Sequence, residues 1–314
     1  RALVNAAGPW AERLLKFTVR DADGQAPHER LSLRLVRGSH IVVPRLFAHA
    51  HAYIFQAGDG RIVFAIPYER SFTLIGTTDV EVADPDGAEA CSDDEVAYLC
   101  NEVNRYFRAA VKPEQVVWRY AGVRPLLEDQ AGDAKAATRD YKLELDRDGA
   151  PLLTVWGGKI TTFRRLSEQA ADQVCAALGE TRPPWTRTAF LPGGDLSGWI
   201  GAAQRPDADF ARFVQVVQQR HAWLPPDLAH RLARAYGSRI DRVLRTRHGN
   251  AAAKLSDLGT EVLPHLFEAE LHYLRRVEWA QGADDVLWRR SKLGLHTSAK
   301  EQQALRDWFG AQPR

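Results

Sequence analysis

Residues 152–162, Leu152-Leu-Thr-Val-Trp-Gly-Gly-Lys-Ile-Thr-Thr162, carry the signal that decides the fold. The apolar and β-branched run predicts a strand, and the two glycines predict a turn that a ligand can approach closely. Apolar residues then recur at helical spacing from about Ile160 to Leu178. The unpaired N–H groups at the start of such a helix attract anions, and Lys159, Thr161 and Thr162 add a charge and two hydroxyls. An ordinary helix cap explains the same residues, so both interpretations stay open.

A second junction of this kind lies near the start of the chain. Asn5-Ala-Ala-Gly-Pro-Trp10 is typical of a strand end, a glycine turn and a proline in the first turn of a helix. The two junctions are separated by a β-rich segment, from about Arg30 to Trp156. This order predicts one cofactor domain that is interrupted by a substrate domain.

The segment between the junctions has hairpin signals and one helix signal. Strands are predicted at 53–55, 61–66, 71–75, 116–120, 141–145 and 152–156. Ser92-Asp-Asp-Glu95 is a capping box ahead of apolar residues at helical spacing. From about Leu196 onward the pattern is helical, with loops at Pro225-Pro226, Gly237 and Gly249-Asn250.

The predicted fold class is α+β and α/β: part of a cofactor-binding domain with an antiparallel β insertion, followed by an all-α domain. The first domain takes residues 1–180, with cofactor-binding segments at 1–29 and 151–180 and a substrate-binding insertion at 30–150. The helical domain takes residues 190–314.

Composition excludes several classes of protein. The chain has 314 residues and 42 basic against 40 acidic side chains, which gives no nucleic-acid footprint. Three widely spaced cysteines favour a reducing compartment, and the ten histidines show no metal-ligand spacing, so no metal is expected. The sequence contains no apolar stretch long enough to span a membrane. It also contains no methionine, so we expect a downstream part of a longer protein.

Six motifs in order carry a family resemblance. They are Asn5–Trp10, Arg37-Gly-Ser-His-Ile-Val-Val-Pro44, Ile75-Gly-Thr-Thr-Asp79, Gly122-Val-Arg-Pro125, Thr138-Arg-Asp-Tyr141 and Trp156–Thr162. Together they resemble the FAD-dependent respiratory glycerol-3-phosphate dehydrogenases of the D-amino-acid-oxidase-like superfamily. Tyr236-Gly, Glu268-Ala-Glu270 and Asp284-Asp-x-x-Trp-Arg-Arg290 resemble that family's C-terminal helical domain. The family's N-terminal Gly-x-Gly-x-x-Gly unit is absent, so the chain alone is expected to bind FAD weakly and to be inactive.

The resemblance implies oxidation of sn-glycerol 3-phosphate to dihydroxyacetone phosphate by hydride transfer to FAD, with electrons passed to a membrane quinone. Arg124 and Arg139 are candidates to bind the phosphate, because guanidinium groups match its oxygens. Arg124 is favoured, since a Gly-Val-Arg-Pro turn constrains a long side chain. His40 is the candidate for substrate contact and for the base, and His40 and Arg124 form the catalytic pair. A histidine hydrogen-bonded within the sheet is the alternative for His40.

The cofactor contacts are assigned to both junctions. They are Ala6, Ala7, Gly8, Trp10, Gly157, Gly158, Lys159, Ile160 and Thr161. For Thr77, Thr78 and Asp79 we expect only a turn that shapes the sheet.

Two alternatives to the quinone-linked enzyme stay open: an oxidase that uses oxygen, and a non-catalytic fragment that cannot hold FAD. The resemblance implies a cytoplasmic protein associated peripherally with the membrane, and a homodimer is left open. Six C-terminal arginines form a solvated basic face or a membrane-surface patch. They are Arg231, Arg234, Arg239, Arg242, Arg245 and Arg247.

Overall fold

A computed structural model gives the fold and describes residues 2–20, 24, 31–127, 140–246 and 248–312. The chain divides into two compact units, residues 1–187 and 188–314. Each unit has a hydrophobic core of its own.

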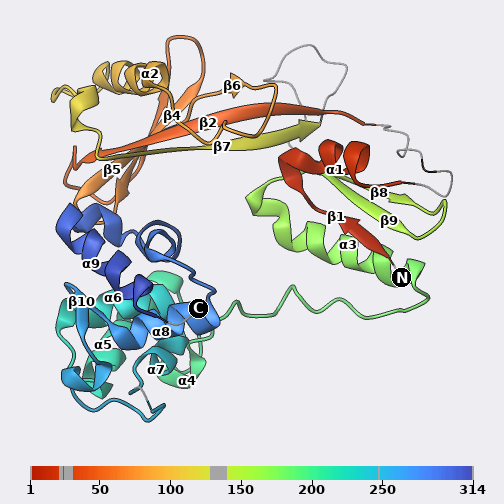
Figure 1. Cartoon of the computed structure of the whole chain (residues 1–314). Helices are drawn as coiled ribbons and strands as arrows, with labels where there is room; N and C mark the ends of the chain where they lie inside the picture. The colour runs from red at the N-terminus through yellow and green to blue at the C-terminus, as the bar shows by residue number, and fades with distance from the viewer. Residues whose placement is uncertain (1, 21–23, 25–30, 128–139, 247, 313–314) are drawn as a thin grey trace. The chain divides into compact units, whose positions relative to one another are not determined.

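In the first unit, the two predicted junctions lie side by side. Strand β1 (Leu3–Asn5) pairs in parallel with β9 (Leu152–Gly157), and β8 (Tyr141–Asp146) pairs antiparallel with the other edge of β9. Parallel strands end at the same edge of a sheet, so the turns that follow β1 and β9 are neighbours. Figure 1 shows α1 (Ala11–Phe17) and α3 (Phe163–Ala177) beside this small sheet.

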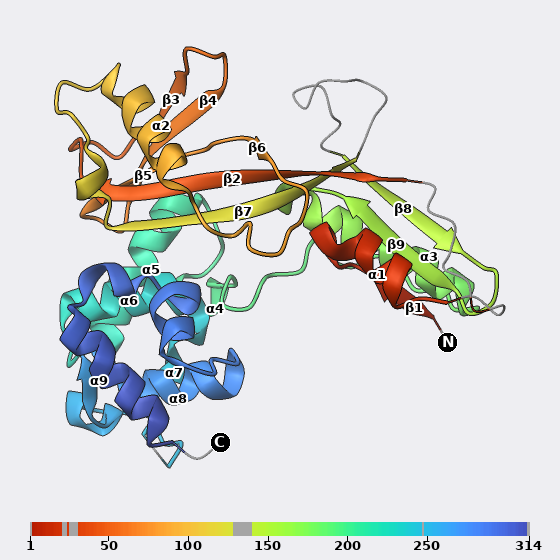
Figure 2. The same cartoon turned by 45° about the horizontal axis from the view of Figure 1, so that its top comes forward.

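A larger antiparallel sheet is built on the long strand β2 (Leu33–Pro44). One edge of β2 pairs with β7 (Trp118–Leu127) along ten residues, and the other edge pairs with β5 and β6. The remaining strands of this sheet have these bounds: β3 (Tyr53–Gln56), β4 (Ile62–Tyr68), β5 (Phe72–Gly76) and β6 (Val80–Glu81). Figure 2 shows β2 and β7 as two long adjacent ribbons.

Helix α2 (Asp93–Asn104) covers one face of the larger sheet. Its predicted capping box is confirmed: the Ser92 hydroxyl accepts from the Glu95 amide, and the Glu95 carboxylate accepts from the Ser92 amide. Ile41 and Val43 of β2 face α2 and join a core that includes Leu99. Side chains alternate along a strand, so the even-numbered residues of β2 lie on the opposite face.

The prediction of a turn at Gly122–Pro125 is wrong, because these residues belong to β7. Gly122 pairs with Gly38, and Arg124 pairs with Val36. A proline is tolerated here because β7 is an edge strand: among the described strands of this sheet, it pairs only with β2. The strand predicted at 116–120 therefore continues to Leu127.

The second unit is mainly helical. Its helices are α4 (Ser197–Ile200), α5 (Pro206–Arg220), α6 (Pro226–Tyr236), α7 (Ile240–Val243), α8 (Glu268–Val277) and α9 (Ala299–Gly310). A π-helical stretch, Asp285–Arg290, carries one of the C-terminal motifs. The unit departs from the predicted all-α pattern at a short hairpin of β10 (Glu261–Leu263) and β11 (Leu266–Phe267).

Arg231 does not belong to a solvated basic face. Both of its terminal nitrogens donate to the buried Glu270 carboxylate, at 2.8 and 2.6 Å, and the Tyr236 hydroxyl donates to the same group at 2.7 Å. The three side chains form one polar cluster that joins α6 to α8, in which Tyr236 and Glu270 are buried and Arg231 is partly exposed. The Tyr236-Gly and Glu268-Ala-Glu270 motifs are therefore explained by packing within this unit.

Candidate functional site

His40 lies near the centre of the larger sheet, on the face opposite α2. Its cross-strand neighbours are Gly76 on β5 and Tyr120 on β7. The imidazole stacks on the Tyr120 ring, with the centroids 5.1 Å apart and the planes within 6°. A Cβ at Gly76 would collide with the imidazole, so only glycine leaves room for it there. The sheet therefore fixes the ring from both sides.

The environment of His40 favours a neutral imidazole. Burial, and then the positive charge of Arg124, lower its pKa from the ordinary 6.5. Its buried Nδ1 has no hydrogen-bond partner within the described part of the chain. A neutral imidazole keeps a lone pair on one ring nitrogen and can therefore act as a proton acceptor.

Arg124 lies on the same face, four residue pairs along the β2–β7 ladder from the His40–Tyr120 pair. Its guanidinium occupies the space that a Cβ at Gly38 would take. Its Nη1 donates to Asp79 Oδ1 at 2.7 Å, and its Nη2 donates to Thr77 Oγ1 at 3.0 Å. The Arg124 side chain is 36% exposed, so the held guanidinium still faces solvent.

Thr77 and Asp79 therefore orient the guanidinium, a role that the sequence analysis missed. Their motif was recognised, but a turn was the only function assigned to it. The signal that could have found them is the pairing of β2 with both β5 and β7, which brings the end of β5 close to Arg124. A single sequence does not show that pairing.

The first junction places Ala6, Ala7, Gly8 and Trp10 after β1. The buried Asn5 holds this segment: its Nδ2 donates to the Ala11 carbonyl at 3.0 Å, and its Oδ1 accepts from the Ala7 amide at 3.3 Å. Gly8 has a φ of +57°, which favours glycine. The Trp10 indole donates to Asp86 at 2.7 Å. A groove along α1 begins at Ala7 and Trp10.

The second junction brings a glycine turn against β7, the strand that carries Arg124. Gly157 and Gly158 have φ values of +69° and +104°. A Cβ at Gly157 would lie 3.6 Å from the carbonyl oxygen of Pro125, the residue after Arg124. Lys159, Ile160 and Thr161 follow and are exposed, in a 3₁₀ turn that leads into α3. The side chains of Lys159 and Thr161 are therefore accessible to solvent at the start of α3.

The structure brings most of the predicted site residues together. Arg124 lies beside His40, Gly157 packs against the strand of Arg124, and the Gly8–Trp10 turn contacts both β7 and β9. Arg139 lies outside the described residues. Among the residues that are described, no group of three or more His, Cys, Asp or Glu side chains could hold a metal ion.

Two family models match the chain. The model described as FAD dependent oxidoreductase matches residues 1–164. The chain belongs to this family. The model described as the C-terminal domain of alpha-glycerophosphate oxidase matches residues 185–309. The family assignment confirms the predicted fold class, an FAD-dependent oxidoreductase fold with a C-terminal helical domain.

Several relatives of this family member have names that point to polyol phosphates. A glycerol-3-phosphate dehydrogenase of Pseudomonas aeruginosa is 43% identical over 97% of this chain and 56% of its own length. The aerobic glycerol-3-phosphate dehydrogenase of Escherichia coli is 40% identical over 98% of this chain and 58% of its own. A D-erythritol 1-phosphate dehydrogenase of Brucella abortus is 37% identical over 98% and 58%.

A solved relative confirms the fold. The glycerol-3-phosphate dehydrogenase of Bacillus halodurans, complexed with FAD, matches with a TM-score of 0.77 and 27% identity, over 98% of this chain and 57% of that one. The chain thus spans somewhat more than half the length of the relatives that it matches.

Proposed function

We propose that the protein carrying this chain oxidises sn-glycerol 3-phosphate to dihydroxyacetone phosphate with FAD as its cofactor. The observation that carries the proposal is the juxtaposition of His40 with the oriented guanidinium of Arg124 on one sheet face. A proton acceptor beside a cationic fork suits a substrate that has a reacting hydroxyl and a phosphate. The names of the relatives support the same substrate.

The residues of both junctions fit a flavin cofactor. Gly157 and Gly158 form a turn with positive φ values, and Lys159 and Thr161 are exposed beside it. We assign cofactor contacts to residues 1–29 and 151–180, and substrate contacts to residues 30–150. Within these segments the junction residues would hold FAD, and Lys159 would supply a positive charge that favours the reduced flavin.

His40 and Arg124 act on different groups of the substrate. FAD, when bound, supplies the hydride acceptor for the C2 carbon. The neutral His40 imidazole takes the proton of the C2 hydroxyl. Arg124 binds the phosphate with its remaining N–H groups, while Thr77 and Asp79 keep its plane fixed. Arg139 is proposed as a second phosphate ligand.

We propose a membrane quinone as the electron acceptor, with peripheral membrane association and a dimeric assembly. Within the described part of the chain, no helix is long and apolar enough to cross a bilayer. Oxygen is the second candidate acceptor, favoured by the match to the C-terminal domain of an oxidase. Reoxidation of the reduced protein by a soluble quinone and by air, measured side by side, distinguishes the two.

The substrate is tested by anaerobic reduction of the FAD-loaded protein. We expect sn-glycerol 3-phosphate to bleach the flavin and glycerol to leave it oxidised, because glycerol offers Arg124 no phosphate. D-erythritol 1-phosphate is the second candidate, since a relative acts on it by name. Faster reduction by D-erythritol 1-phosphate would transfer the proposal to that substrate, and equal reduction by glycerol would contradict a phosphate site.

A further inference from the structure

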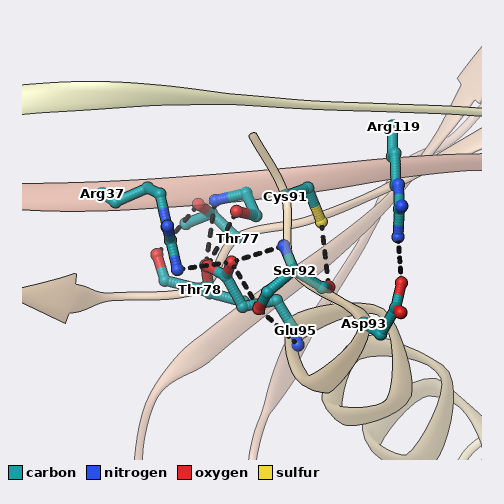
Figure 3. Close-up of polar contacts among 9 residues, drawn as sticks. Arg37, Thr77, Thr78, Cys91, Ser92, Asp93, Glu95 and Arg119 are labelled. Atoms are coloured by element: carbon teal, nitrogen blue, oxygen red, sulfur yellow. Dashed lines mark hydrogen bonds and ion pairs between the residues drawn. The ribbon is translucent and has the colours of Figure 1, made fainter. Parts of the chain in front are cut away.

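A buried polar network lies behind the candidate site, on the α2 side of β2. At its centre is the carboxylate of Glu95, which is 5% exposed. Its Oε1 accepts from the hydroxyls of Ser39 and Thr78, both at 2.7 Å. Its Oε2 accepts from the Ser92 amide and hydroxyl, both at 3.0 Å, and pairs with Arg37 at 2.9 Å. Figure 3 shows Arg37, Thr78 and Ser92 converging on this side chain.

The network makes more contacts than a helix cap needs. A capping box requires only the exchange between Ser92 and Glu95. Here the other carboxylate oxygen reaches two hydroxyls outside α2. Burial opposes ionisation of Glu95, but hydrogen bonds from the Ser92 amide, Thr78 and Ser39 outweigh it, so its pKa lies below the ordinary value. Glu95 is thus a buried anion with every oxygen in use.

Thr78 connects this network to the candidate site. Its hydroxyl accepts from the Ser39 amide at 2.9 Å, and its own amide donates to the Ser39 carbonyl at 3.4 Å. Ser39 stands between Gly38, which lies under Arg124, and His40. Thr77 and Asp79, the two neighbours of Thr78, hold the guanidinium on the opposite face.

We propose that Glu95 is a positioning residue that fixes Thr77 and Asp79, through Thr78, and so sets the orientation of Arg124 for the substrate phosphate. The inference rests on the proposed function of Arg124. Glu95 itself pairs with Arg37 on the α2 side of β2, and among the described contacts it makes none to the guanidinium of Arg124.

Glu95→Gln tests the inference in the FAD-loaded protein. Glutamine keeps one acceptor oxygen, so it can serve the Ser92 cap or the two hydroxyls, and it removes the charge opposite Arg37. We expect the KM for sn-glycerol 3-phosphate to rise roughly 10- to 100-fold with kcat little changed, since a displaced guanidinium weakens phosphate binding. Thr78→Val, which leaves the capping box intact, should raise KM in the same way if Glu95→Gln folds poorly.

Helix α9 offers a matched control. It begins with the same capping box, in which Ser298 and Glu301 exchange hydrogen bonds. Glu301→Gln should therefore weaken a cap and leave KM unchanged. If Glu301→Gln raises KM as much as Glu95→Gln does, Glu95 acts only as a helix cap and the inference is wrong.

A double-mutant cycle separates positioning from general damage. In an Arg124→Ala background, Glu95→Gln should no longer change KM, because the group through which it acts is gone. Equal effects in both backgrounds would overturn the inference.

Failure of the proposed function has a different signature. If the parent protein does not reduce its flavin with sn-glycerol 3-phosphate, the substrate assignment fails. Amide exchange then tests positioning directly: exchange of the Thr78 amide should be faster in Glu95→Gln than in Glu301→Gln, and equal rates would contradict the inference.

Discussion

At the scale of single residues, Arg124 decides whether the proposed site binds a phosphate. Replacing it with alanine removes a charge-assisted hydrogen bond of about 1.5–3 kcal/mol, or roughly 10- to 150-fold in kcat/KM for sn-glycerol 3-phosphate. FAD content should not change. Arg119 is the matched control, because it lies on the same strand but bonds to Asp93 of α2. Equal losses of kcat/KM in Arg124→Ala and Arg119→Ala would show that Arg124 does not bind the phosphate.

His40 predicts a pH dependence. A lowered pKa means that the imidazole is neutral above that pKa, so flavin reduction should rise as the pH rises through it and then level off. His40→Gln should lose this acid limb and reduce the flavin roughly 10²–10⁴-fold more slowly. The control variant is His51→Gln, because His51 is an exposed histidine. Reduction by His40→Gln within a few-fold of the parent would mean that His40 only orients the substrate.

The same lowered pKa affects stability. The unfolded chain binds a proton at His40 near pH 6.5, whereas the folded chain binds it only at lower pH. The contribution of His40 to stability is therefore full above pH 6.5 and is lost as the pH falls through the folded pKa. Urea unfolding of parent and His40→Gln at several pH values should show a smaller acid destabilisation in the variant. Identical pH dependence in the two proteins would contradict the shift.

At the scale of the elements, glycines on neighbouring strands make room for the site. Gly76→Ala should displace the His40 ring and slow flavin reduction roughly 10- to 100-fold, with FAD still bound. Gly122→Ala is the control, since a Cβ at Gly122 would meet no atom within 4 Å. Stopped-flow reduction rates compare the two. If Gly122→Ala slows reduction as much as Gly76→Ala, the effect belongs to the sheet and not to the histidine.

Elements with local signals were predictable from the sequence. The Ser92–Glu95 box fixed the start of α2, and alternation with turn glycines indicated β3 and β4. The course of β7 was not predictable, because Gly122 and Pro125 are residues typical of turns. Their extended conformation comes from pairing with β2, about 85 residues earlier in the chain. Tertiary pairing here overrides local propensity.

At the scale of the whole molecule, the candidate site depends on segments that are far apart in sequence. The two glycine junctions are neighbours because β1 and β9 pair in parallel. The holding of Arg124 by Thr77 and Asp79 was missed because it depends on the register of three strands. Composition and motif order thus identify which segments matter, whereas long-range register decides which side chains meet.

The second unit, residues 188–314, is expected to fold on its own. Its core is formed by side chains from residues 200–305, including the fully buried Phe213, and the Arg231–Glu270 pair is also internal to it. Residues 188–314 expressed alone should therefore unfold cooperatively in urea, with coincident transitions in tryptophan fluorescence and circular dichroism.

Phe213→Ala should lower the free energy of unfolding by about 3–5 kcal/mol, because it leaves a cavity in this core. The exposed Gln303 is the control, and Gln303→Ala should change stability by about 0.5 kcal/mol or less. Non-coincident transitions, or equal stability of Phe213→Ala and the parent unit, would show that this core is not sufficient for folding.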